Sequence, residues 1–96
     1  MYATVRRYEG VTDPREAARV VNEGFVQLIS QVPGFVAYYW VDAGGNVIVS
    51  TSIFQTQAGA EESNRRAADY VRQNMAHLLP NPPQITAGEV VAHKAK

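Results

Sequence analysis

Polar side chains interrupt several segments that otherwise look like apolar β-strands. An arginine, a glutamate, two serines and three aromatic residues with polar tips stand at alternate positions, and alternate residues of a strand face the same side of its sheet. Such a group could hold a small aromatic or apolar molecule by stacking and hydrogen bonding. The candidate ligand-binding residues are Arg6, Tyr8, Tyr38, Trp40, Ser50, Ser52 and Glu89.

Arg6 and Glu89 are the charged members of this set. A charge inside an apolar sheet needs a partner, and adjacent first and last strands could bring these two together. The pair is either a structural ion pair or one that also orients a ligand. Arg7 competes with Arg6 for the interior position, because alternation lets only one of them point inward. Glu89 is the one carboxylate of the set and therefore the candidate catalytic base.

No motif for a bound cofactor or metal is visible. The chain has no phosphate-binding glycine loop, no nucleophile motif and no metal-spaced cluster of histidines and carboxylates. It has no cysteine, which removes thiol catalysis and thiolate metal sites. His77 is expected near a helix end, where it interacts with the helix dipole, and His93 at the frayed end of the last strand. We expect neither cofactor nor metal.

The charge balance bears on the possible partners. Nine basic residues match nine acidic ones, giving formal net charge +0, so a nucleic-acid partner is not expected. The N-terminus enters a strand at once, without the apolar core of a signal peptide. No apolar run approaches the length of a membrane span. We expect a cytoplasmic protein that does not contact a membrane.

Hydrophobic periodicity predicts four strands and two helices in the order β, α, β, β, α, β. Asp13 and Thr56 are suitable N-caps for the helices, and prolines follow both. The expected strands cover residues 2–9, 35–42, 46–55 and 84–93, and the expected helices run from Asp13 to about Val32 and from Thr56 to about Leu79. The stripe that docks the first helix on the sheet consists of Ala17, Val21, Phe25, Leu28 and Val32.

Ala43-Gly44-Gly45 separates the two central strands. The loop is either two glycines in a primed turn or three residues with a glycine bulge, and this choice decides which residues share a face. We favour the three-residue loop, which places on one face Phe35, Ala37, Tyr39, Val41, Val47, Val49, Thr51 and Ile53. The opposite face then carries Val36, Tyr38, Trp40, Ile48, Ser50, Ser52 and Phe54. Its mixture of aromatics and hydroxyls suits a cavity better than a helix-packed core.

This order of elements predicts a single α+β domain over residues 1–96, with a ferredoxin-like antiparallel sheet and both helices on one face. The face without helices carries large apolar side chains on either loop reading. A second copy of the chain is the simplest cover for it, so we expect a homodimer.

The chain resembles the antibiotic biosynthesis monooxygenase-like (ABM) family of the dimeric α+β barrel superfamily. The resemblance covers nearly all of it and rests on the element order, the chain length, the Pro33-Gly34-Phe35 entry to the second strand and Phe54 at the end of the third. It implies a homodimeric barrel of two facing sheets, with helices outside and a small-molecule cavity inside each half. Relatives of this shape include cofactor-free monooxygenases, haem-degrading oxygenases and isomerases, so the resemblance is specific for fold and not for function.

The haem-degrading branch does not fit the residues. Its members use an asparagine on the first strand, a tryptophan early in the second helix and a histidine about three turns later. Here the first strand has no asparagine, Trp40 lies on the second strand, and His77 lies near the end of the second helix.

Three functions remain open. The first is a cofactor-independent oxygenase or related enzyme that orients an electron-rich aromatic substrate whose carbanion reacts with oxygen. The second is a non-catalytic dimer that binds a small ligand. The third is a filled barrel with a structural or stress-associated role. We favour a monooxygenase-like small-molecule protein with a cavity inside a homodimeric barrel, and the volume of this interior separates the first two functions from the third.

Overall fold

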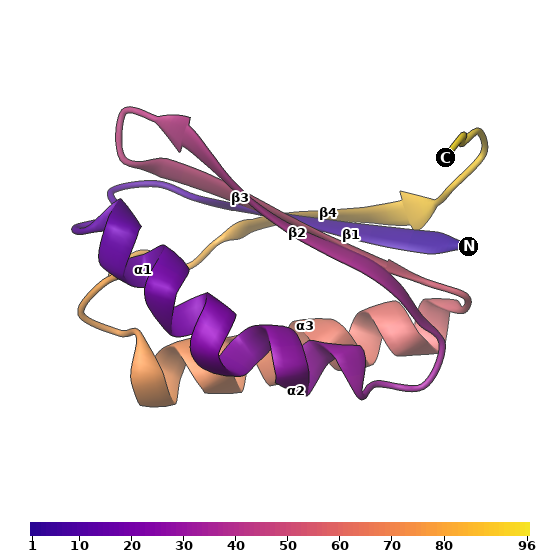
Figure 1. Ribbon diagram of the computed structural model, residues 1–96, viewed down its shortest axis with the longest axis horizontal. Coiled ribbons are helices and arrows are strands. Elements are labelled where there is room, and N and C mark those ends of the chain that lie inside the picture. The colour runs from indigo at the N-terminus through magenta and orange to yellow at the C-terminus, as the bar shows by residue number, and fades with distance from the viewer.

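The computed structural model describes all 96 residues as one four-stranded antiparallel sheet with helices on one side (Figure 1). The strands lie in the order β2-β3-β1-β4, so the first and last strands are neighbours. Their bounds are Tyr2–Tyr8 for β1, Phe35–Gly44 for β2, Val47–Phe54 for β3 and Gln84–Glu89 for β4. The helical segments are α1 (Pro14–Val20), a π-helical turn η1 (Val21–Phe25), α2 (Val26–Ser30) and α3 (Gln57–Asn74). The predicted fold class and element order are confirmed.

The first helix begins as its sequence predicts. The Asp13 side chain accepts a hydrogen bond from the backbone N–H of Glu16, and Pro14 takes the first helical position, where its missing N–H costs nothing. The helix continues through η1 into α2 without a break in the chain direction (Figure 1).

The π-helical turn changes which residues of this helix are buried. Its buried positions are Ala17, Val21, Phe25 and Ile29, each four residues after the last. In a regular α-helix a four-residue step drifts by about 40° around the axis. The wider turn removes part of this drift. The predicted stripe was therefore wrong at Leu28, which is only half-buried while Ile29 is fully buried.

The hairpin between β2 and β3 turns at Gly45-Asn46, which neither loop considered from the sequence anticipated. Both residues have positive φ, 61° and 62°, as a type I′ turn requires. A register shift between Asp42 and Gly44 leaves Ala43 of β2 without a partner in β3. From the pair Ala37–Ile53 toward the turn, each face of the two strands therefore carries the residues that the three-residue loop predicted. Phe35 is the exception, because a second shift between Phe35 and Ala37 pairs it with Phe54.

Helix α3 and strand β4 are both shorter than predicted. The Thr56 hydroxyl caps α3 by accepting from the N–H of Gly59 at 3.1 Å. The helix ends at Asn74, and the N–H groups of Leu78 and Leu79 both bond the carbonyl of Met75 in a tight turn instead of continuing it. Strand β4 ends at Glu89, although residues to 93 were expected.

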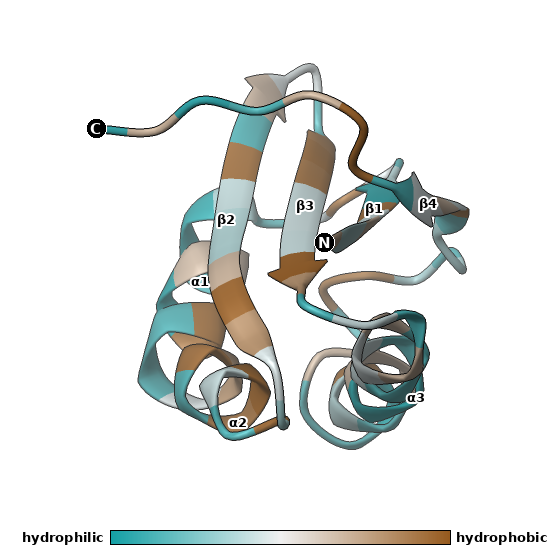
Figure 2. Ribbon diagram, turned by 90° about the vertical axis from the view of Figure 1, so that its right-hand side faces the viewer, coloured by the Kyte–Doolittle hydropathy of each residue, from teal (hydrophilic) through white to brown (hydrophobic).

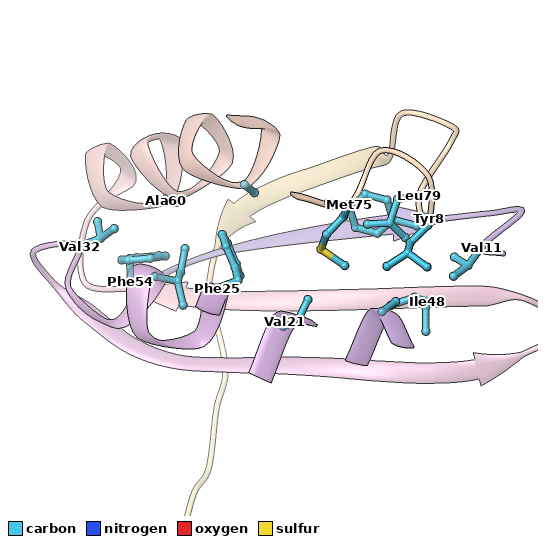
Figure 3. Packing of buried hydrophobic residues seen from close by; sticks show 14 residues of the cluster. Tyr8, Val11, Val21, Phe25, Val32, Ile48, Phe54, Ala60, Met75 and Leu79 are labelled. Atoms are coloured by element: carbon cyan, nitrogen blue, oxygen red, sulfur yellow. The ribbon is translucent and has the colours of Figure 1, made fainter. Parts of the chain in front are cut away.

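The helices cover the face opposite to the one expected. Tyr38, Trp40 and Phe54 lie on the helix-covered side, packed against the core that the helices contribute. Figure 2 shows α1, α2 and α3 all on the same side of the sheet. In the close-up, Phe25 and Phe54 lie between sheet and helices, and Tyr8 lies beside Met75 and Leu79 (Figure 3). The expectation that this set faces a second sheet was wrong.

Both strand faces are apolar enough to serve as a core, which explains the error. Under the helices each of the three aromatic side chains of this set finds a ring to pack on: Tyr38 on Phe25, Trp40 on Tyr8 and Phe54 on Phe35. The open face carries mostly small and β-branched side chains, together with Tyr39 and Arg7. They form three cross-strand rows: Ala37, Ile53 and Ala3, then Tyr39, Thr51 and Val5, then Val41, Val49 and Arg7.

Candidate functional site

A cleft of about 300 Å³ opens between α3, strands β1 and β4, and the proline-rich segment that joins α3 to β4. This volume lies at the lower end of the range for small-molecule pockets, about 300–1,000 Å³. Half of its lining residues are hydrophobic. It is lined by Arg6, Tyr8, Asn64, Ala67, Ala68, Val71, Arg72, Ala76, Leu79, Pro80, Asn81, Pro82, Pro83 and Ile85.

A smaller cavity of about 10 Å³ lies deeper, between the sheet, the π-helical turn and α3. Its volume fits one oxygen atom or one water molecule. It shares Arg6, Tyr8, Ala67 and Val71 with the cleft, so Arg6 and Tyr8 are the polar side chains that border both spaces. Its lining residues are Arg6, Tyr8, Val21, Phe25, Tyr38, Trp40, Ser50, Ala67, Val71 and Met75.

Arg6 is a buried cation with no acidic partner. The side chain is 1% exposed, and its two terminal nitrogens both donate to the hydroxyl of Ser52 at 3.2 Å. Its Nε has no hydrogen-bond partner in the protein. Burial lowers the pKa of the guanidinium, and only the neighbouring phenols of Tyr8 and Tyr38 oppose this shift. An arginine remains charged at neutral pH even so.

Tyr8 and Tyr38 place neutral phenols near this charge. Burial raises the pKa of both side chains, and the attraction to Arg6 offsets the shift only in part. Both therefore remain protonated at neutral pH, where they can donate a hydrogen bond but cannot act as bases.

Trp40 supplies a second buried donor without a partner. Its indole Nε1 has no hydrogen-bond partner in the protein, and its ring lies 5.9 Å from the ring of Tyr8, centroid to centroid. Ser50 pairs with Trp40 on one side and with Arg6 on the other, so the three residues form one row across β2, β3 and β1.

Several solved structures share this architecture. A protein of unknown function from Nitrosomonas europaea is 22% identical, with a TM-score of 0.80, over 99% of this chain and 93% of that one. The monooxygenase ActVA-Orf6 of Streptomyces coelicolor, solved with nanaomycin D, is 17% identical, with a TM-score of 0.72, over 99% and 91%. SnoaB, a cofactor-independent oxygenase from Streptomyces nogalater, is 16% identical, with a TM-score of 0.64, over 98% and 94%.

The chain has the fold of the antibiotic biosynthesis monooxygenase-like proteins. The fold resemblance noted from the sequence is thereby confirmed. No protein-family model and no curated protein sequence matches the chain.

Within this ABM-like fold, most of the predicted site residues gather on one face. Arg6, Tyr8, Tyr38, Trp40 and Ser50 line the inner cavity, and the Ser52 hydroxyl bonds Arg6. Their space lies between the sheet and the helices of one chain, which corrects the expected position between two sheets. Their role in binding stays a prediction.

The expected pair of Arg6 with Glu89 was wrong. Arg6 lies opposite Ile85 in the β1–β4 register, whereas Glu89 lies opposite Tyr2, about 13 Å further along the strand. Glu89 is exposed and forms no ion pair, so it is too distant to serve as a base in the cleft. Of the two neighbouring arginines, Arg6 is the one that points inward. Arg7 is exposed and forms an ion pair with Glu9 at 2.9 Å.

Sequence reasoning missed the wall that α3 contributes. Asn64, Ala67, Ala68 and Val71 recur at three- and four-residue spacing, which marks one helix face. The alanines are small enough to leave room beneath the helix, and this pattern was the available signal. Asn64 accepts a hydrogen bond from the Thr4 hydroxyl at 3.0 Å, which leaves its amide nitrogen as its remaining polar group.

The site is rich in donors and lacks bases. None of the residues around either cavity is an aspartate, a glutamate or a histidine. The chain has no group of three or more histidine, cysteine or acidic residues placed to hold a metal ion. The arrangement can therefore stabilise negative charge on a ligand oxygen, but it offers no side chain to remove a proton.

No helix of the structure is both long and apolar enough to cross a membrane.

Proposed function

We propose that the chain is a small-molecule, monooxygenase-like protein whose substrate lies in the cleft between α3 and the sheet. The observation that carries this proposal is the largely apolar cleft of about 300 Å³ with the buried Arg6 in its wall. Pockets that combine apolar walls with a few convergent polar groups are the usual sites for small molecules.

Two solved structures of the same fold suggest which reaction the proposed protein would catalyse. The Streptomyces coelicolor protein is a monooxygenase that binds nanaomycin D, and the Streptomyces nogalater protein is an oxygenase that needs no cofactor. By analogy, the substrate is an aromatic molecule that reacts with oxygen through its own carbanion.

The reaction that fits the donors of the cleft converts an activated CH₂ group into a carbonyl. The substrate CH₂ loses a proton to water, the enolate that remains reacts with O₂, and loss of water from the peroxide yields the C=O group. One O₂ is consumed and one H₂O is released. Arg6 would stabilise the enolate oxygen in a site of low dielectric constant, where a fixed positive charge acts strongly.

Oxygen uptake tests this function. Anthrone, a tricyclic aromatic ketone with an activated CH₂, should consume one O₂ per anthraquinone formed, faster with the protein than in buffer alone. Arg6→Met should abolish the acceleration. Arg15→Met removes an exposed charge on α1 and should leave it unchanged.

The alternative function is a non-catalytic protein that binds a small ligand. The absence of any carboxylate or imidazole around the cleft favours it, because no side chain there can act as a base. Calorimetry decides between the two functions. Anthrone or a related aromatic ketone that binds in the cleft and yet is not oxidised faster than in buffer would establish the binding function and refute the oxygenase.

We further propose that two copies pair through the open sheet face. Tyr39 is 60% exposed and Val41 is 50% exposed on this face, and their neighbours across the strands are mostly apolar. Apolar surface of this kind favours a symmetric partner. The cleft lies on the opposite side of the sheet, so each protomer would keep its own site.

A further inference from the structure

The charge of Arg6 demands a counter-ion that the protein does not supply. All six ion pairs of the chain involve other arginines, and all six lie at least partly in solvent. A buried guanidinium that bonds only one serine hydroxyl is costly, since a neutral hydroxyl does not neutralise the charge. Proteins retain such costs mainly where function requires them.

The unsatisfied hydrogen-bonding capacity around Arg6 also consists of donors. Arg6 Nε and Trp40 Nε1 are the buried side-chain nitrogens without a partner, and each has only a hydrogen to offer. Both residues line the inner cavity, which has room for a single oxygen atom. A ligand oxygen carrying negative charge would satisfy the charge and the donors together.

The cleft determines what the rest of such a ligand looks like. Beyond Arg6 most of its walls are alanine, valine, leucine, isoleucine and proline side chains. Tyr8, Asn64 and Asn81 add neutral polar groups, and no acidic group is present to repel an anion. Arg72 adds a second positive charge to the lining, although its guanidinium already bonds Asp69 at 2.7 Å. Arg6 is therefore the one cation of the cleft without a protein counter-ion.

We propose that the ligand is a compact aromatic anion, with a carboxylate or ionised enol bound by Arg6 and its apolar body in the cleft. This inference names the substrate class of the proposed function and rests on the same cleft. Trp40 donates to the same end of the ligand, and the neutral phenols of Tyr8 and Tyr38 flank it.

Matched probes test the charge requirement. We would measure binding of 2-naphthoate and of its uncharged analogue 2-naphthamide by calorimetry at pH 7 and low salt, under nitrogen so that no turnover occurs. An acidic enol, 2-hydroxy-1,4-naphthoquinone, and its neutral 2-methoxy ether form the second pair. We expect at least one anion to bind about tenfold or more tightly than its neutral partner. The pair that discriminates identifies the carboxylate or the enolate as the anionic group.

Variants assign the selectivity to Arg6. In Arg6→Met the anion should lose its advantage, so that charged and neutral probes bind alike, while the unfolding midpoint should not fall because a costly buried charge is gone. Arg15→Met, which removes an exposed charge, should keep the wild-type selectivity. Trp40→Phe keeps the aromatic ring and removes the N–H, and should weaken anion binding several-fold.

The outcomes separate the ligand class from the reaction. Equal affinity for the charged and neutral members of both pairs, or wild-type selectivity in Arg6→Met, would overturn the ligand class and leave a neutral substrate possible for the proposed function. A lowered unfolding midpoint in Arg6→Met with unchanged binding would make Arg6 a structural residue. Anion selectivity without oxygen uptake would remove only the reaction. Failure of all four probes to bind would remove both proposals.

Discussion

Gly24 lies where the π-helical turn η1 packs against α3, and the absence of a Cβ there makes room for Tyr70. A Cβ at this position would clash with the hydroxyl oxygen of Tyr70. That hydroxyl donates to the carbonyl of Val20 at 3.1 Å, and the Tyr70 ring packs on Phe25 with centroids 5.4 Å apart. The tyrosine is therefore held from two directions and cannot move away freely.

We expect Gly24→Ala to destabilise the protein, and Tyr70→Phe to relieve that loss. Alanine should gain up to about 1 kcal/mol in helix propensity, which the clash with Tyr70 outweighs in the wild type. In the Tyr70→Phe background the clash is reduced, so the coupling free energy should reach about 1 kcal/mol or more. A double-mutant cycle by urea unfolding measures it, and additive effects would show that Tyr70 rearranges without cost.

Tyr38 should make the stability depend on alkaline pH. Burial raises its pKa in the folded state, whereas an unfolded tyrosine ionises near pH 10. The folded state thus holds the proton to higher pH, and its stability should fall as the pH rises above about 10. Tyr38→Phe should lose less stability than the wild type between pH 9 and pH 11 in urea titrations. Parallel losses in both proteins would contradict this assignment.

At the scale of elements, the first turn of α3 depends on one hydroxyl. The Thr56 side chain accepts from the N–H of Gly59, and α3 forms one wall of the cleft. Thr56→Ala should lower the free energy of unfolding by about 1 kcal/mol, whereas Thr56→Asn, which keeps an acceptor, should cost much less. Thermal and urea unfolding of both variants check this. Equal losses would mean that packing of Thr56, and not its hydrogen bond, stabilises the helix start.

At the scale of the whole molecule, the open sheet face should control assembly. Tyr39→Glu places a charge in the middle row of that face, and in the proposed dimer it would be buried twice by symmetry. We expect light scattering to give a dimer mass for the wild type at micromolar concentration and a monomer mass for Tyr39→Glu. Gln73→Glu adds the same charge on an exposed position of α3 and should remain dimeric. A monomeric wild type would end the dimer proposal.

Local rules of the chain were sufficient for much of this fold. Asp13 and Thr56 cap their helices because a side-chain oxygen before a helix satisfies a free N–H wherever the helix packs. Strand alternation correctly grouped Tyr38 with Trp40 and Ser50 with Ser52, since the two-residue period is a property of each strand alone.

The tertiary structure decided what local rules leave open. Both sheet faces are apolar, so packing across the core chose the side that the helices cover, with Tyr38 against the ring of Phe25 and Phe54 against Phe35. The register of β4 against β1 placed Ile85, and not Glu89, opposite Arg6. Register between strands separated by the whole chain depends on packing across the sheet, and no short-range pattern encodes it. The absence of a counter-ion for Arg6, which leads to the proposed ligand, could therefore be found only in the folded molecule.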